Sequence, residues 1–242
     1  MIQRTLAAFA LSLTMPVVAS ANVLTINSPD IKKGITSLEV GMRWDLDDDK
    51  AKDHFREYAL EAEHGITDYW GIGFEFVAER EHGEGTRYAV TAMEHTFQFL
   101  RQGKDAPFSL GLRVEYEKAH VSDATDEAKA RLLLRYRNDR FEGRFNIGGD
   151  REVGDHAERG FNGDVRMSLR YRVEDYFIPA LDYLGSIGRV DAMPGFDDQT
   201  HRLGPVIYGH VNHAIGYQVG YLAGISAAAP DHTLKLAMEY KF

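Results

Sequence analysis

Apolar and polar residues alternate in recurring runs along this chain. The last run covers residues 234–242, where apolar side chains occupy every second position: Leu234, Leu236, Met238, Tyr240 and Phe242. A period of two gives a β-strand one apolar face and one polar face. Comparable runs recur at intervals of roughly 15 to 20 residues, as expected for strands of about ten residues plus their connections. The pattern predicts an all-β protein of about twelve strands.

Some of these runs are less regular than the last one. Pro179 lies inside a run that starts at Phe177, and Pro205 interrupts a weaker run over 200–211. Because proline cannot donate a hydrogen bond to a strand ladder, we expect a bulge or a kink at these positions. A run over 87–99 also predicts a strand, but its alternation does not fix which face is apolar.

The connections between the runs alternate in length. Short connections fall near Thr67, Lys104, Asn138, Glu174 and Asn212, and longer ones near Asp49, Glu84, Ala124, Asp155, Met193 and Ala229. With both termini in the periplasm, the short set are periplasmic turns and the long set are extracellular loops. A soluble β-sandwich also has alternating strands, but it has no reason to sort its connections in this way. We therefore expect a closed antiparallel transmembrane β-barrel.

The first 21 residues have the features of a secretory signal peptide. Arg4 precedes an apolar run over 6–15, and Ala19-Ser20-Ala21 provides a cleavage site of small residues. The apolar run is too short to span a bilayer. We expect a signal peptide over 1–21 and a barrel domain over 22–242.

The terminal strand that ends on Phe242 resembles those of bacterial outer-membrane β-barrel proteins, a class that includes porins and transporters. In that class the barrel assembly machinery recognises the last strand. The resemblance implies that Tyr240 and Phe242 form the assembly signal. It also implies a location in the outer membrane, in contact with its lipids and with lipopolysaccharide.

Composition excludes several other classes of protein. The 37 acidic residues outnumber the 28 Lys and Arg, for a formal net charge of −9, which argues against nucleic-acid binding. Cysteine is absent, so an exported form has no disulfide framework. After the first segment no apolar stretch approaches the length of a transmembrane helix.

The polar face of the predicted strands carries charges that are sorted by strand. The acidic positions are mostly early: Glu39, Asp45, Glu57, Glu61, Glu75 and Glu115. The basic positions belong to the middle strands: Arg113, Lys129, Arg131, Arg135, Arg137, Arg144, Arg166, Arg170 and Arg172. In a closed barrel these sets form an acidic wall opposite a basic wall of the lumen.

Two interpretations of this lumen stay open. The walls can line a narrow channel or transporter for small polar or charged solutes, because charged rings set selectivity in pores. The basic wall then favours carboxylates, which arginine binds bidentately. Alternatively the walls pair with each other and plug the lumen of a structural or adhesive barrel. Size does not decide, because a barrel of about twelve strands lies between those of about eight strands, which side chains fill, and those of about sixteen, which hold an aqueous channel.

An outer-membrane lipid-modifying enzyme is a further alternative. His82, His120, His156 and His232 lie in or beside the predicted extracellular loops, but no G-x-S-x-G motif is present, and we assign no catalytic residue. The acidic run over 47–53 offers oxygens to Ca²⁺ but lacks the glycine and distal glutamate of an EF-hand loop. We expect an outer-membrane channel without metal or cofactor rather than an enzyme.

Overall fold

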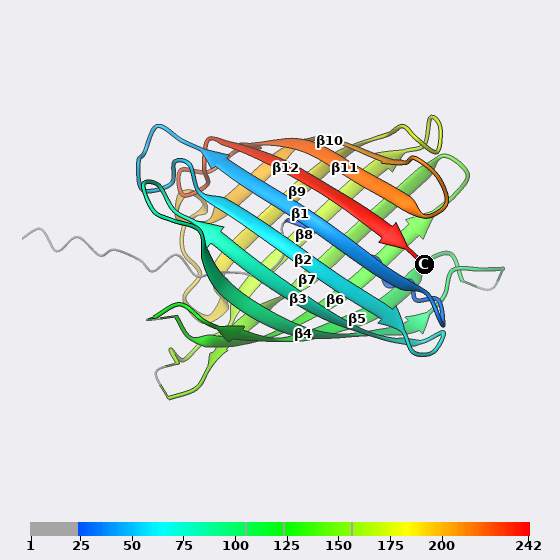
Figure 1. Cartoon of the computed structure of the whole chain (residues 1–242), viewed down its shortest axis with the longest axis horizontal. Helices are drawn as coiled ribbons and strands as arrows, with labels where there is room; N and C mark the ends of the chain where they lie inside the picture. Colours follow the sequence, from blue (N-terminus) through cyan, green and yellow to red (C-terminus); the bar gives the residue numbers. More distant parts are fainter. Residues whose placement is uncertain (1–23, 105, 123, 156) are drawn as a thin grey trace, which may run out of the picture.

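Twelve antiparallel strands form a closed barrel in the computed structural model, which describes residues 24–104, 106–122, 124–155 and 157–242 (Figure 1). The strands are β1 (Thr36–Leu46), β2 (Arg56–Gly65), β3 (Trp70–Arg80), β4 (Arg87–Leu100), β5 (Ser109–Ala119), β6 (Asp126–Arg137), β7 (Phe141–Val153), β8 (Asn162–Tyr171), β9 (Ile178–Arg189), β10 (Thr200–His210), β11 (Ile215–Gly224) and β12 (His232–Lys241). The prediction of an all-β barrel with about twelve strands is confirmed. The predicted signal peptide lies outside the described residues.

The barrel closes where the first strand pairs with the last. β1 and β12 are antiparallel over ten residue pairs, from Ser37 opposite Lys241 to Leu46 opposite His232. The seam ends in two backbone hydrogen bonds: Thr36 N–H donates to Phe242 O at 3.0 Å, and Phe242 N–H donates to Thr36 O at 2.9 Å. Figure 1 shows blue β1 directly beside red β12. Every strand therefore has two neighbours, so no strand edge is left unpaired.

The outer face of the barrel is apolar and the inner face is polar. On β3, Phe74 and Phe76 are 43% and 44% exposed, whereas Glu75 between them is 2% exposed. The same alternation exposes large apolar side chains around the whole wall: Leu38, Val40, Leu60, Met93, Leu132, Ile147, Leu169, Leu181, Val219, Leu236 and Met238. Apolar side chains outside and polar side chains inside are the reverse of the arrangement in a soluble protein, and they are typical of a β-barrel in a bilayer.

The connections at the two ends of the barrel differ in length, as predicted, with two exceptions. The connection over 172–177, expected to be short, is as long as those over 81–86 and 120–125 at the other end. The connection over 101–108 was expected to be short, but it exceeds the connections over 81–86 and 120–125 at the other end. Arg101 in this connection donates to Ile31 O at 2.7 Å and to Asp68 O at 2.8 Å, so it ties neighbouring segments together. The connection over 190–199 holds two short 3₁₀ turns, Val190–Ala192 and Phe196–Asp198. Among the described residues, no helix has the length and apolar character needed to cross a membrane.

We expected a bulge or a kink at the two prolines, and no register shift lies at either of them. Pro179 and Pro205 lie opposite Ile207 and Leu181 in a continuous β9–β10 register. Between β10 and β11 the pairing is interrupted at Gly204 and Pro205, and it resumes without a shift. Proline removes one donor, but here the ladder on the other side keeps the strand aligned. The register shifts lie elsewhere, at residues 77–78, 98–100 and 163–164.

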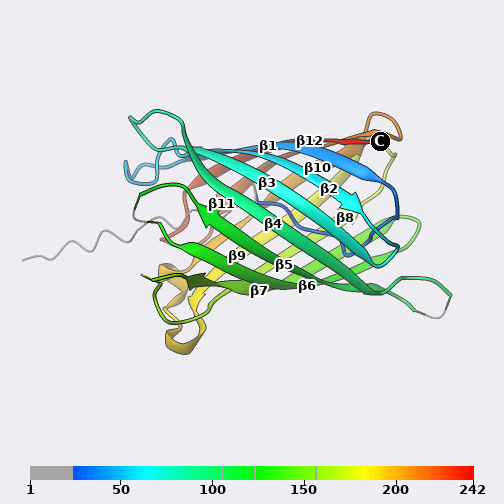
Figure 2. The ribbon, with the colours of Figure 1, turned by 60° about the horizontal axis from the view of Figure 1, so that its bottom comes forward.

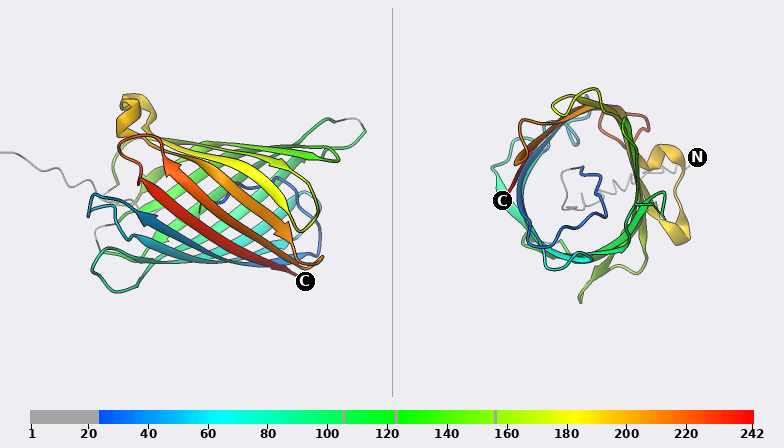
Figure 3. Two further views of the ribbon diagram at one scale, coloured as in Figure 1. Left: turned by 90° about the horizontal axis from the view of Figure 1, so that it is seen from above. Right: turned by 90° about the vertical axis from the view of Figure 1, so that its right-hand side faces the viewer.

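The chain before β1 runs inside the barrel. We call residues 24–35 the lumen segment; Figure 3, which includes a view along the barrel, shows this blue segment within the ring of strands, and Figure 2 shows the strands that surround it. Leu24 and Ile26 are buried against Leu184, Val206 and Leu222, which point inward from β9, β10 and β11. This apolar cluster therefore lies within a largely polar interior, which also holds a second buried apolar cluster formed by Ala59, Val77, Ala89, Val90 and Ala92.

Deletion of Phe242 tests the contribution of the seam. It removes two ladder hydrogen bonds and is expected to lower the free energy of unfolding by about 1–2 kcal/mol, with less protein assembled in membranes. Urea unfolding in lipid vesicles, followed by tryptophan fluorescence, measures the change. Phe242→Leu keeps both backbone bonds and serves as the control. An unchanged unfolding midpoint after the deletion would contradict this account of the seam. Recognition of Tyr240 and Phe242 by the assembly machinery stays a prediction.

Candidate functional site

The strands place the predicted wall residues inside the barrel at different depths. The buried members are Asp45, Glu57, Glu61, Glu75, Arg113, Glu115, Lys129, Arg131, Arg166 and Arg170. Glu39, Arg135 and Arg144 are half-buried, and so is Arg172, which follows β8. Arg137, at the end of β6, is exposed. Acidic residues are concentrated on β1 to β4 and basic residues on β6 to β8, but each group also contains charges of the opposite sign.

The carboxylates of β2 and β4 gather around one arginine. Arg113 Nη2 forms ion pairs with Glu61 and Glu94, and it lies 3.2 Å from Glu63 Oε1. The arginine side chain is 4% exposed. Glu94 was not among the predicted wall residues, because the facing of its strand was not fixed by the sequence. Arg113 thus lies within the acidic group rather than on an opposite wall.

A second network joins β5, β6 and β8. Lys129 Nζ lies 2.6 Å from Glu117 Oε1 and 3.0 Å from Glu127 Oε2. Arg131 donates from Nε and Nη2 to the Asp164 carboxylate, at 3.0 and 2.5 Å. Much of the charge in the middle of the lumen is therefore paired with residues on nearby strands, as burial of ionised groups requires.

A further buried ion pair, separate from these two networks, connects β9 with β12. Lys235 Nζ lies 3.0 Å from Asp182 Oδ2, with the two side chains 1% and 0% exposed. Ser168 donates to Asp182 Oδ1 at 2.6 Å and Tyr208 donates to Asp182 Oδ2 at 2.6 Å. Neither Lys235 nor Asp182 was predicted as a wall residue. The polar face of the terminal strand could have indicated Lys235, because it alternates with Leu234 and Leu236.

Cations from the barrel wall bind carbonyl groups of the lumen segment. Lys235 Nζ donates to Leu24 O at 3.1 Å, Arg166 Nη1 to Thr25 O at 2.9 Å, and Arg144 Nη1 to Ile26 O at 2.9 Å. These three residues come from β12, β8 and β7. Two of the predicted basic residues therefore hold an internal segment of the chain in place.

Amide side chains fix the next part of the lumen segment. Asn27 N–H donates to Asn146 Oδ1 at 2.8 Å, and Asn146 Nδ2 donates back to Asn27 O at 3.1 Å. At Gly111 the wall comes so close that a Cβ atom there would lie 2.8 Å from the Pro29 Cβ. The paired amides and this close approach give the segment one defined position.

Asp30 anchors the other half of the lumen segment. It forms an ion pair with Arg135 and accepts a hydrogen bond from Gln98 Nε2 at 3.2 Å. Gln98 also accepts from Ile31 N–H, at 3.4 Å. Arg135, a predicted basic wall residue, is therefore partly neutralised by the segment itself.

Two cavities lie on either side of the lumen segment and share Thr25, Ser28 and Asp30 in their linings. The smaller has a volume of about 330 Å³, and we call it the arginine cavity because six arginines line it: Arg135, Arg137, Arg140, Arg144, Arg170 and Arg172. The larger, of about 670 Å³, faces β1 to β3 and includes Glu39, Glu61, Glu63 and His64. Both lie towards the end with the short connections.

The arginines of this cavity differ in their partners. Arg144 Nε donates to Glu142 at 2.7 Å, and Arg170 stacks over the Tyr208 ring at 3.6 Å. Towards the barrel end, Arg140 donates to the Tyr171 hydroxyl at 3.1 Å and Arg172 lies 3.5 Å from Asp175. The cavity also holds Glu39, Glu142 and Glu239, but arginine predominates in its lining.

The loop residues considered for catalysis have other partners. His120 Nε2 lies 2.8 Å from the Thr91 hydroxyl, and His232 Nδ1 lies 2.7 Å from the Tyr221 hydroxyl. Neither histidine is paired with a serine in these contacts. His156 lies outside the described residues. His82 instead packs its ring against that of His54, with centroids 5.5 Å apart.

The acidic loop over 47–53 uses its carboxylates to cap its own backbone. Asp47 accepts hydrogen bonds from Asp49 N–H at 2.6 Å and from Asp231 N–H at 3.1 Å, and it pairs with Lys52 at 3.0 Å. Burial raises the pKa of Asp47, but these hydrogen bonds outweigh it and hold the pKa below its ordinary value. The contacts make this loop compact.

The likeness of this chain to known proteins lies in its structure and not in its sequence. No protein-family model matches the sequence, and no curated protein matches it. Similar solved structures include an outer membrane channel from Pseudomonas putida F1, with a TM-score of 0.66 and 12% identity over 88% of this chain and 97% of that one. They also include the NanC porin, with a TM-score of 0.61 and 11% identity over 86% of this chain and 100% of that one. The KdgM porin in complex with disordered oligogalacturonate has a TM-score of 0.57 and 8% identity over 86% of this chain and 99% of that one.

The likeness concerns the fold. Together with the apolar outer face, it defines this chain as a transmembrane β-barrel of the bacterial outer-membrane class, in agreement with the predicted location. The similar structures named here are porins and channels, and what this chain shares with them is the fold.

Lys235→Met tests the buried ion pair. It leaves Asp182 buried without its cation and is expected to lower the free energy of unfolding by about 3–5 kcal/mol. Lys241→Met is the matched control: Lys241 is 44% exposed beside Glu239, and its loss is expected to cost about 1 kcal/mol or less. Urea unfolding in vesicles compares the two variants. Equal effects would contradict a structural role for the Asp182–Lys235 pair.

Proposed function

We propose that this barrel is a narrow outer-membrane channel for small anionic solutes, carboxylates above all. The observation that carries the proposal is the arginine cavity, where six guanidinium groups line about 330 Å³ next to the lumen segment. Arginine binds carboxylates through two parallel hydrogen bonds, which gives orientation as well as attraction. A small carboxylate is therefore the solute class that this lining fits best.

The position of the arginines within the barrel supports the same solute class. Deep in the lumen, Arg131 and Arg113 are paired with Asp164, Glu61 and Glu94. Nearer the barrel end, Arg137 is exposed and Arg140 has a neutral partner, the Tyr171 hydroxyl. A cluster with more cations than carboxylates attracts anions and raises their local concentration. Selectivity for anions would therefore be set at this end.

The lumen segment makes the channel narrow. It occupies the space between the arginine cavity and the more acidic cavity of about 670 Å³. Because the wall fixes it through Asn146, Arg144, Arg166 and Lys235, a permeating solute must pass beside it. This restriction favours small solutes over large ones.

A plugged structural barrel is the second candidate function. The segment and the buried ion pairs, such as Asp182–Lys235, favour it because they fill part of the interior. Conductance in planar lipid bilayers separates the two candidates. Stepwise ion current through the purified protein supports the channel, and its absence under all conditions supports the plugged barrel. The enzyme alternative has no comparable support, because His120 and His232 contact Thr91 and Tyr221.

Charge reversal at the barrel end tests the selectivity. In Arg137→Glu/Arg172→Glu, two cations of the arginine cavity become carboxylates, and the preference for chloride over potassium is expected to change to a preference for potassium. The reversal potential in a KCl gradient measures this ratio. Arg151→Glu, at an exposed position near the other end, is the control. An unchanged reversal potential in the double variant would rule out the arginine cavity as the selectivity element.

Removal of the lumen segment tests the restriction. Deletion of residues 24–33 leaves β1 intact and is expected to raise the single-channel conductance several-fold, because the two cavities then merge. Asn146→Ala, which loses the paired amide contact, is expected to give an intermediate or fluctuating conductance. Asn162→Ala is the control, since Asn162 bonds Asp150 and not the segment. The restriction is refuted if the deleted and full-length proteins conduct alike.

A further inference from the structure

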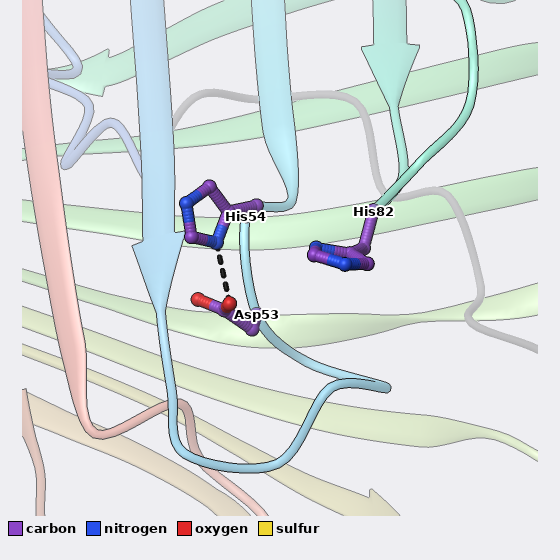
Figure 4. Close-up of side chains that lie close together, drawn as sticks. All are labelled: Asp53, His54 and His82. Atoms are coloured by element: carbon purple, nitrogen blue, oxygen red, sulfur yellow. Dashed lines mark ion pairs between the residues drawn. The ribbon is translucent and has the colours of Figure 1, made fainter.

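The loops at the end with the long connections bring three metal-binding side chains together. Asp53 and His54 belong to the connection between β1 and β2, and His82 belongs to the connection between β3 and β4 (Figure 4). The candidate ligand atoms of the three side chains all lie within 4.8 Å of one another. We propose that Asp53, His54 and His82 bind a divalent transition-metal ion of the zinc type. This proposal does not depend on the channel function.

The geometry of the three side chains needs only a small adjustment. His54 Nδ1 lies 2.5 Å from Asp53 Oδ2, and the rings of His54 and His82 meet edge to face at 71°. Ligand atoms of a tetrahedral zinc ion lie about 3.4 Å apart. Candidate atoms that are up to 4.8 Å apart here must therefore approach by up to about 1.4 Å, and the His54–Asp53 pair at 2.5 Å must open by about 0.9 Å. His82 is exposed, so rotation of its side chain costs little. One or more coordination positions stay open to water.

The backbone presents His54 in a conformation that non-glycine residues seldom adopt. Its φ angle is +59°, in the left-handed region. On one side of this strained residue, Asp45 N–H donates to Phe55 O at 2.9 Å, and on the other Asp47 N–H donates to Asp53 Oδ1 at 3.2 Å. Strain of this kind persists where surrounding contacts enforce it, and it is frequent at binding sites.

The second loop is held as firmly as the first. Arg80 Nε donates to Glu84 O at 3.0 Å, and Arg87 pairs with Glu81 and, at 3.2 Å, with Glu84. Gly83 turns the chain at φ +77°. Because both loops are ordered before a metal arrives, binding requires little further loss of conformational freedom.

The ligand types select the class of metal. Two imidazoles and one carboxylate suit Zn²⁺, Co²⁺, Ni²⁺ and Cu²⁺, whereas Ca²⁺ and Mg²⁺ prefer oxygen ligands. The acidic residues of the first loop, among them Asp48 and Asp49, add a negative field that attracts cations. A bound ion would link two neighbouring loops at the mouth of the barrel.

Metal titration of the full refolded barrel, purified without a histidine tag, tests the proposal. Co²⁺ is the probe, because its visible absorption reports imidazole coordination, and Zn²⁺ is then added as a competitor. We expect one Co²⁺ per chain, displaced by Zn²⁺ but not by Ca²⁺. His54→Ala and His82→Ala are each expected to weaken binding roughly tenfold or more, as loss of a ligand or its support does.

Three further variants complete the experiment. His213→Ala, in the connection between β10 and β11 at the opposite end, is expected to bind like the wild type. His82→Gln and Asp53→Asn remove a ligand while nearly keeping the size of the side chain. They replace the alanine variants in the titration if an alanine variant does not fold. The proposal is overturned if the wild type shows no saturable Co²⁺ spectrum, or if His54 and His82 can both be replaced without loss of affinity.

Discussion

The structure depends on the pairing of β1 with β12. In hydrocarbon every backbone N–H and C=O group must find a partner within the protein, and a sheet satisfies this only when its two edges meet. Thr36 and Phe242 complete that pairing through their two reciprocal hydrogen bonds. Closure in turn fixes which alternate positions face lipid, so the apolar exterior and the polar interior both follow from it. It also encloses the chain that precedes β1.

An ionic interior follows from closure, and the ions then need partners. Pairs between nearby strands supply many of them, as with Arg131 and Asp164 or Lys235 and Asp182. The lumen segment supplies others through its carbonyl groups and Asp30, because a buried guanidinium or ammonium group is costly when left unpaired. The same segment divides the remaining space into two cavities of different charge. Under the proposed channel function, stability and restricted permeation thus have a common origin.

The sequence predicted the barrel because its strongest signal, alternation with a period of two, is also the signal of strands in lipid. It failed where alternation is disturbed. The facing of β4 was hidden by irregularities at both of its ends, which concealed Glu94. One lies at Ala89, opposite residues 77–78 of β3, and the other at residues 98–100. Of the bulge or kink expected at Pro179 and Pro205, the bulge is absent, because one intact ladder suffices to hold a strand in register. The lumen segment has no periodicity, so nothing in the sequence indicated that it lies inside the barrel, or that Arg144 and Arg166 would bind it.

Cross-linking across the seam tests closure most directly. The chain has no cysteine, so Val40→Cys/Met238→Cys creates the only thiol pair, at residues that lie opposite each other in β1 and β12. In membrane-inserted protein a short bifunctional thiol reagent is expected to join them within one chain. Val40→Cys/Tyr217→Cys, at residues that both lie opposite Met238 of the intervening β12, places the thiols about twice the ~4.8 Å strand spacing apart and should react poorly. Equal yields from the two pairs, or no product from the first, would contradict a closed barrel.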